Sequence, residues 1–216
     1  MRGFRTLALG MGLAALSLAP AAASDEAVEL WLNPAVAWSL DDRTDIRLET
    51  AQRLRPEGRP DTYFARLWLN RKLTDAVTIS GAMERRANEP GNDETRLIQQ
   101  LSGKRGIWRG RLRLEQRFVD DQQTGHRLQP RLGVELPVGD GEHWKAFADG
   151  ELFLTLRSTS AGGDTGLTAV RTRVGASYKV SDRLSLTLAY LRQQDIDRSG
   201  PDRVGHAPLI GVDLSF

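Results

Sequence analysis

The sequence has no cysteine among its 216 residues, and it has only three histidines. The lack of cysteine excludes a disulfide scaffold and any thiolate metal site. The mean hydropathy of −0.40 excludes a helical protein with several membrane spans. Long apolar runs are also missing, apart from one at the extreme N-terminus. What remains is a chain long enough for one domain or two small ones.

The N-terminal segment has the pattern of a secretory signal peptide. Arg2 and Arg5 form a positive start, Leu7 to Leu18 is a short apolar core, and Ala21 to Ala23 is a small-residue cleavage site. We therefore expect residues 1–23 to be a signal peptide that is removed on export. A retained N-terminal helix that tethers the chain is the alternative.

Removal of residues 1–23 changes the charge balance of the chain. The full sequence holds 30 Lys+Arg and 28 Asp+Glu, and the segment removes two arginines and no acid, which leaves 28 of each. A neutral chain has no overall positive field for nucleic acid, so we expect no nucleic-acid partner. We expect residues 24–216 to form one exported domain.

The exported part of the sequence alternates between two kinds of side chain with a period of two. Leu67 and Leu69, for example, alternate with Arg66 and Trp68. Such alternation indicates strands with two different faces and an all-β fold. The same division recurs over residues 46–54, 63–70, 77–86, 94–101, 108–118, 127–136, 145–154, 170–179, 184–191 and 208–216.

One of the two faces carries no charge in these segments apart from Arg85 near the end of residues 77–86, and many of its residues are small. Small residues would pack poorly in a dry protein core but are tolerated against lipid, where a charge near the midplane costs about 2–4 kcal/mol. Segments of about nine to twelve residues also match the span of a tilted membrane strand. We therefore predict a transmembrane antiparallel up-and-down β-barrel of ten to twelve strands. A soluble periplasmic carrier of lipocalin type is the rival fold.

Short and longer connections alternate along the sequence, which is typical of outer-membrane barrels with short periplasmic turns and longer outside loops. Aromatic residues on the uncharged face lie near both ends of the segments, as two interfacial girdles would require. The short connections are 41–44, 73–76, 102–107, 138–143 and 180–183, and the longer ones are 55–61, 87–93, 120–125, 157–166 and 195–205. The girdle residues are Trp38, Trp108, Trp144, Tyr178 and Phe216 at the short-turn ends and Tyr63, Phe118 and Tyr190 at the long-loop ends.

The strand count presents a problem, because an eleventh segment runs from Glu29 to Leu40. Single-chain bacterial barrels have even numbers of strands. Either this segment lies outside the main ladder and leaves ten strands, or another strand is hidden and makes twelve. Pro34 within the segment cannot donate to a ladder, and Pro130 inside another strand is expected to mark a bulge.

The C-terminus resembles the assembly signal of bacterial outer-membrane barrels, which ends in an aromatic residue preceded by apolar residues at every second position. Ile210, Val212, Leu214 and Phe216 fit this pattern, with Pro208 before them. The resemblance implies a location in the outer membrane of a Gram-negative bacterium, contact with its lipid, and the barrel-insertion machinery as a transient partner.

The body of the chain resembles an uncharacterised outer-membrane β-barrel family, domain of unknown function 2490. The similar stretches are 94–100, 111–118 and 173–175, which read ETRLIQQ, RLRLEQRF and RVG. The resemblance covers most of the exported chain, and it implies the barrel fold but no known activity and no known site.

The charged face is expected to point into the barrel, where basic side chains outnumber acidic ones by fifteen to eight. One interpretation is a structural barrel plugged by Arg–carboxylate pairs. The other is a narrow passive channel whose surplus arginines favour small anionic solutes. The predicted lumen residues are Arg47, Arg53, Arg66, Arg86, Arg96, Arg109, Arg111, Arg113, Arg117, Arg127, Arg131, Lys145, Arg171, Arg173 and Lys179, with Glu49, Glu84, Glu94, Glu115, Glu135, Asp149, Glu151 and Asp213.

A third interpretation is an outer-membrane hydrolase with its site in the long loops. Histidine and aspartate together can activate water. No Ser–His spacing and no metal-ligand motif is present, so we expect no catalytic residue, no metal and no cofactor. The residues on which the hydrolase hypothesis depends are His126, His206, Asp120, Asp121, Asp195 and Asp197.

Overall fold

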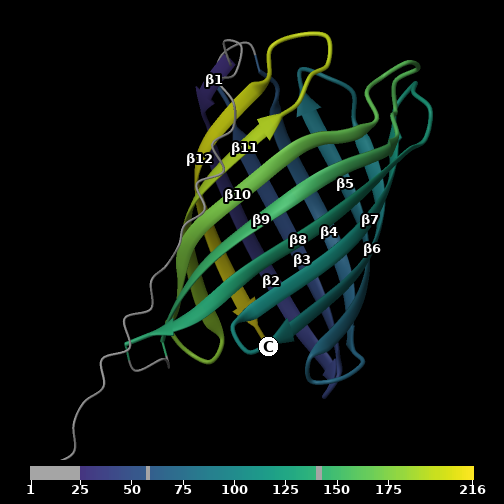
Figure 1. Ribbon diagram of the computed structural model, residues 1–216. Helices are drawn as coiled ribbons and strands as arrows, with labels where there is room; N and C mark the ends of the chain where they lie inside the picture. The colour runs from purple at the N-terminus through teal and green to yellow at the C-terminus, as the bar shows by residue number, and fades with distance from the viewer. Residues whose placement is uncertain (1–24, 57–58, 140–142) are drawn as a thin grey trace, which may run out of the picture.

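The computed structural model describes residues 25–56, 59–139 and 143–216, so the predicted signal peptide lies outside the described residues. No helix in the described part is long and apolar enough to span a membrane. The chain forms a barrel of tilted strands, with long loops at one end and short turns at the other (Figure 1). The strands are β1 (Asp25–Val28), β2 (Leu30–Asp41), β3 (Thr44–Leu54), β4 (Asp61–Lys72), β5 (Val77–Glu89), β6 (Glu94–Arg105), β7 (Trp108–Val119), β8 (Gly125–Val138), β9 (Trp144–Arg157), β10 (Gly166–Lys179), β11 (Leu184–Asp195) and β12 (Arg203–Ser215).

Strands β2 to β12 pair in sequence order as antiparallel neighbours, and β12 then pairs with β2 to close the barrel. Each strand from β2 onward has 11 to 14 residues, which is enough for a tilted strand to cross a bilayer. The prediction of a transmembrane β-barrel with ten to twelve strands is confirmed, because the closed ladder from β2 to β12 has eleven.

The closing pair is parallel, so the expectation of an even number of strands was wrong. Strand β2 pairs with β12 from Trp31 opposite Leu209 to Ala37 opposite Ser215. An odd number of strands can close only when one pair is parallel, because neighbours otherwise alternate in direction. The segment from Glu29 to Leu40 therefore lies in the ladder and not outside it.

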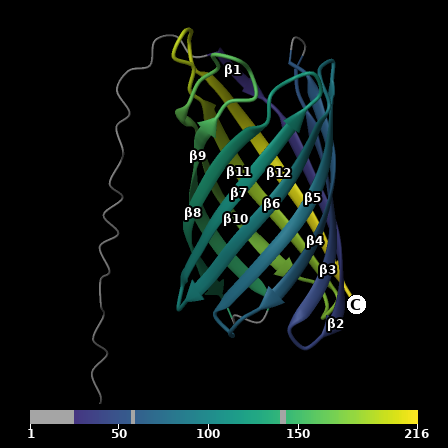
Figure 2. The ribbon, with the colours of Figure 1, turned by 90° about the vertical axis from the view of Figure 1, so that its right-hand side faces the viewer.

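The extra strand β1 continues this seam. It pairs in parallel with the first four residues of β12, from Arg203 to His206. Strand β2 pairs with the same edge of β12 further along, from Leu209 to Ser215. The backbone N–H of Glu29, between the two strands, donates to the carbonyl of His206 at 2.8 Å. The described chain therefore begins at the long-loop end, whereas its C-terminus lies at the short-turn end (Figure 2).

Four prolines lie within the described strands, and the two in the middle of β2 and β8 each interrupt pairing with one neighbour only. Pro34 lies opposite Val212 on β12 but has no register partner on β3. Pro130 lies opposite Leu112 on β7 but has no register partner on β9. The register between β8 and β9 does shift between His126 and Arg127, where Leu156 of β9 is the extra residue, but it is the same on both sides of Pro130. The expectation that Pro130 marks a bulge is therefore wrong.

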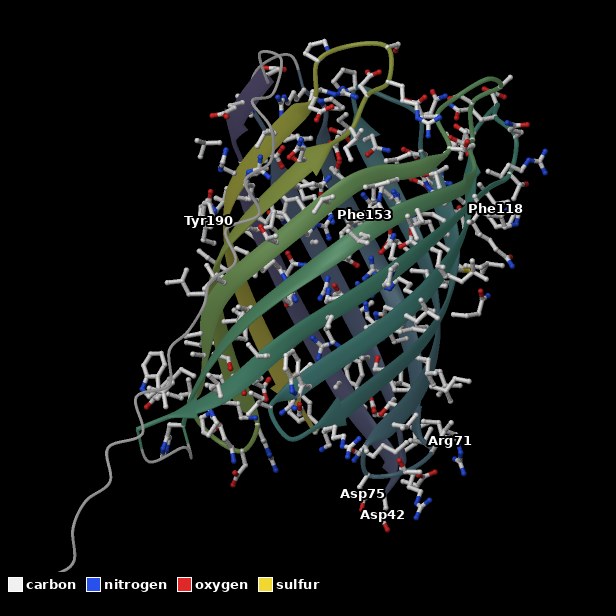
Figure 3. All side chains as sticks on the ribbon, in the orientation of Figure 1. Asp42, Arg71, Asp75, Phe118, Phe153 and Tyr190 are labelled. Atoms are coloured by element: carbon white, nitrogen blue, oxygen red, sulfur yellow. The ribbon has the colours of Figure 1, made fainter. Side chains whose placement is uncertain are left out.

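The outward surface of the barrel is apolar along the middle of the strands. Leu67, Met83 and Leu188 are 54%, 59% and 64% exposed, although they lie at strand centres. Charged outward side chains lie at the strand ends, as with Arg71 near the short turns. Tyr190 and Phe118 lie at a common level towards the long loops, and Asp42 and Asp75 mark the short-turn end (Figure 3).

Candidate functional site

The inward side chains of β3 to β10 form a charged belt in which acids and arginines alternate from strand to strand. Direct register partners place Glu49 against Arg66, Arg66 against Glu84, and Glu84 against Arg96. Such cross-strand pairs of opposite charge stabilise a sheet. The charged belt consists of Glu49, Arg66, Glu84, Arg96, Glu115, Arg127, Arg131, Glu151 and Arg171.

Three glutamates of the charged belt are almost completely buried, and each contacts three arginines. Glu84 is 0% exposed and accepts hydrogen bonds from Arg66 at 2.7 Å and Arg86 at 2.8 Å, with Arg96 at 3.6 Å. A buried carboxylate is tolerated only when several donors compensate for its lost hydration. Glu84 meets that condition.

The other two buried glutamates have the same kind of surroundings. Glu115 is 1% exposed and accepts from Arg127 at 2.7 Å, with Arg96 at 3.5 Å and Arg113 at 3.8 Å. Arg96 therefore bridges Glu84 and Glu115, and its Nη2 atom also donates to Glu94 at 2.6 Å.

The third buried glutamate, Glu151 on β9, links the arginines of the neighbouring strands β8 and β10. It is 1% exposed and lies 2.7 Å from Arg131 and 3.3 Å from Arg171, and it also accepts from Arg111. Arg131 approaches Asp149 at 3.8 Å, and Asp149 in turn accepts two hydrogen bonds from Arg173 at 2.7 and 3.1 Å.

Aromatic rings inside the barrel provide a second support for the guanidinium groups. Arg53 lies 3.9 Å from the centroid of Trp31, and Arg171 lies 5.0 Å from the same ring. Arg171 also lies 4.7 Å from the ring centroid of Phe153, and Arg127 lies 5.1 Å from it. Such contacts are attractive because the ring face is negative. Phe153 lies on the charged face of the alternation over residues 145–154, and that position is the signal by which it could have been found in the sequence.

The inward faces of β11, β12 and β2 share an apolar patch. Its buried cluster consists of Trp31, Ala189, Leu191, Ala207 and Leu209, with Phe147 packed against it. The closing parallel seam runs through this patch, since Trp31 lies opposite Leu209. The sequence analysis did not predict this patch, because it treated the inward face only as a set of charges.

Two cavities enter the barrel from opposite ends. The long-loop vestibule has a volume of about 270 Å³, and its lining includes nine arginines, the three carboxylates of Glu94, Glu115 and Asp195, and Gln129, Gln193 and Phe153. The short-turn vestibule has a volume of about 370 Å³ and is lined by Arg109, Arg111, Arg131 and their neighbours. The two share no lining residue, and Glu151 belongs to neither. Within the described residues, Glu151 lies between the two vestibules, because it contacts Arg111 and Arg131 of the short-turn lining and Arg171 of the long-loop lining.

The remaining predicted lumen residues lie towards the ends of the barrel. Arg117 donates to Glu94 at 2.5 Å. Arg109 donates to Glu135 at 2.9 Å, with Lys145 at 3.6 Å from the same carboxylate. Arg47 pairs with Asp213 on β12, near the closing seam. These pairs extend the charged lining from the belt towards both ends of the barrel.

The histidines and aspartates of the hydrolase hypothesis do not form one cluster in the described part of the chain. The Nδ1 atom of His206 lies 2.6 Å from the hydroxyl of Tyr190 on the outer surface. Asp120 lies 3.5 Å from Arg85, and Asp197 accepts from the backbone N–H of Ser199 at 2.9 Å. That N–H lowers the pKa of Asp197. No group of three potential metal ligands is found among the described residues.

Comparison with known proteins gives a family and a fold. The sequence model of a family described as "Protein of unknown function (DUF2490)" matches residues 28–204. A solved structure described as "NanC porin structure in rhombohedral crystal form" matches with a TM-score of 0.53 at 10% sequence identity, and the match covers 80% of this chain and 88% of that chain. At this identity the likeness shows a porin-like fold alone. No curated protein matches the sequence.

Proposed function

The chain belongs to the DUF2490 family, and we propose that it is an outer-membrane channel that passes small anionic solutes. One observation carries this proposal, which is the excess of fifteen basic side chains over eight acidic ones on the inward faces. Fixed charge of one sign in a narrow pore attracts ions of the opposite sign and repels those of the same sign. A lumen of this composition favours anions.

The proposed location is the outer membrane of a Gram-negative bacterium, reached through the periplasm. The secretory pattern at residues 1–23, the apolar outward surface and the C-terminal pattern ending at Phe216 support this location. With the short turns in the periplasm, the long loops face outside. The long-loop vestibule is then the external mouth of the channel. Outer-membrane lipid and the barrel-insertion machinery are the partners we propose.

The separation of the two vestibules implies a low conductance. A solute passes from one to the other only when side chains around Glu151 move, and those of Arg111 and Arg131 are the ones that line the short-turn side. Long arginine side chains change rotamer on a nanosecond timescale when exposed and more slowly when paired. We therefore expect small, infrequent openings.

The same separation favours a second function, that of a structural barrel plugged by ion pairs. Its specific support is that Glu151 contacts three arginines and lines neither vestibule. In this case the belt would hold the barrel wall together and no solute would cross.

Recordings in planar lipid bilayers distinguish the two functions. The purified barrel is inserted under a KCl gradient, and the reversal potential is measured. An anion channel shifts the reversal potential towards that of chloride, whereas a plugged barrel gives no current. Heat-dependent migration in gels shows that the barrel is folded in either case. A cation-selective current would overturn the channel proposal. A preparation from cells that lack the gene serves as the control.

A further inference from the structure

Buried polar atoms without a hydrogen-bond partner are unevenly distributed between donors and acceptors in this barrel. In the described residues there are six such side-chain atoms, and five of them are donor nitrogens. The five belong to Arg53, Arg96, Arg111, Arg131 and Gln129. Buried donors are almost always paired in native proteins. The interior therefore has more buried donors than acceptors, and an acceptor from outside the chain, either water or an anion, has to pair with them.

Arg53 is the most exceptional of these donors. Its guanidinium stacks on Trp31 at 3.9 Å and lies 5.5 Å from the ring centroid of Phe64, but no ion pair joins it to a carboxylate within the described chain. The basic neighbours in the same vestibule differ, because Arg86 and Arg127 contact Glu84 and Glu115 at 2.8 and 2.7 Å. Arg53 alone among these three holds an uncompensated charge.

Residues from distant strands converge on this charge. Arg53 on β3 and Arg171 on β10 lie over the same ring of Trp31, and both line the long-loop vestibule. Gln129 on β8 also lines it, is 2% exposed, and has a side-chain amide nitrogen without a partner. Arg171 already donates to Gln193 at 2.9 Å and to Glu151 at 3.3 Å, whereas Arg53 Nε and Gln129 Nε2 have no partner. Three strands thus bring donor groups to one cavity, and two of these groups are unpaired.

We propose that the long-loop vestibule holds a binding site for a small hydrophilic oxyanion, with Arg53 as its central donor and Gln129 and Arg171 as flanking donors. The planar fork of arginine fits carboxylate and phosphate oxygens in pairs. The cavity of about 270 Å³ limits the ligand to a small one. The role of this site rests on the proposed function, because a binding site at the outer mouth would concentrate the solute before it crosses the channel.

Isothermal titration calorimetry of the full-length barrel in detergent tests this site directly. Inorganic phosphate and lactate are the probes, so that the two oxyanion types are measured separately, and glycerol is the uncharged control. We expect saturable binding of at least one probe. Arg53→Gln should weaken it at least tenfold, and Gln129→Leu should weaken it about threefold, a loss of about 0.6 kcal/mol.

The matched control is Arg109→Gln, which removes the same charge from the short-turn vestibule. It should bind as tightly as the unaltered barrel. Equal weakening by Arg53→Gln and Arg109→Gln, or no saturable binding of either probe, would overturn the site. Arg53→Lys keeps the charge without the fork and should bind less tightly than the unaltered barrel; equal binding would overturn the assignment of Arg53 as a bidentate donor.

The result separates this site from the channel. Saturable binding that depends on Arg53 in a barrel without conductance would leave the site and remove the channel. An anion-selective current without such binding would leave the channel and remove the site.

Discussion

The inner and outer surfaces of the barrel are made from alternate residues of the same strands, yet they follow opposite rules for charge. On β4, outward Leu67 is 54% exposed, whereas inward Arg66 is 6% exposed and contacts two carboxylates. The difference shows that, at the same depth along a strand, a charge is tolerated where it has partners and is excluded where it faces lipid. The outer surface offers lipid and no partner, and the inner surface offers a partner to almost every charge.

The largest test of this contrast removes a central acid of the inner surface. Glu151→Gln leaves Arg111, Arg131 and Arg171 without their shared carboxylate. Breaking a buried ion pair by removing one partner costs about 3–5 kcal/mol. We expect a loss of that size in the free energy of unfolding, measured by urea titration in liposomes. Glu135→Gln, at a half-buried carboxylate near the short turns, is the control and should lose much less. Equal losses would mean that burial does not set the cost.

The next test places a charge on the outer surface. Leu67→Arg puts a guanidinium against lipid near the centre of β4, and it should cost about 2–4 kcal/mol of unfolding free energy. The matched control is Leu40→Arg, which lies at the short-turn end of β2 and should cost at most about 1 kcal/mol. Urea titration of the two variants measures both. A cost that does not depend on position would contradict lipid contact.

A smaller effect is expected for an inner charge that has no carboxylate partner. Arg53→Gln removes an unpaired cation but also its contacts with the rings of Trp31 and Phe64, so the two effects offset each other and the stability should change by less than about 1 kcal/mol. Arg96→Gln is the contrasting variant, because it leaves Glu84, Glu94 and Glu115 short of a donor and should cost about 3 kcal/mol or more. Similar losses for both variants would show that Arg53 has a partner after all.

The smallest effect is expected at the rim of the short-turn end, where solvent covers the charges. Lys179 and Asp182 form an exposed pair at the short turn between β10 and β11, with Nζ and Oδ1 2.6 Å apart. The hydrogen bond from Lys179 lowers the pKa of the Asp182 carboxyl. Lys179→Ala should return that pKa towards 3.8, which carbon NMR of the carboxyl group measures. The variant should leave the stability unchanged, because solvent screens the pair. A pKa that stays low would assign the shift to another group.

The sequence was sufficient for the outer surface and for the strands, because a period of two and a charge-free face follow directly from the order of residues. Leu67, Met83 and Leu188 were all placed on that face and are all exposed. The alternation of short and longer connections likewise gave the two ends of the barrel. These features are local, so one strand can be interpreted without its neighbours.

The inner surface could be predicted only as a list of charges, because pairing depends on register. Arg66 and Arg53 look alike in the sequence, yet register places Arg66 between Glu49 and Glu84 and places Arg53 between Trp31 and Thr62. The parallel pairing of β2 with β12 could not be predicted from the sequence either, because it joins segments at opposite ends of the chain. Contacts of this range have no local signal.

The most direct test of the account is whether lipid touches the charge-free surface. Two variants that each keep one tryptophan, Trp108 on the outer surface at 53% exposure or Trp31 on the inner surface at 3%, are placed in liposomes with brominated lipid chains. The account predicts that bromine quenches the fluorescence of Trp108 strongly and leaves that of Trp31 nearly unchanged. Equal quenching of the two, or quenching of neither, would contradict it.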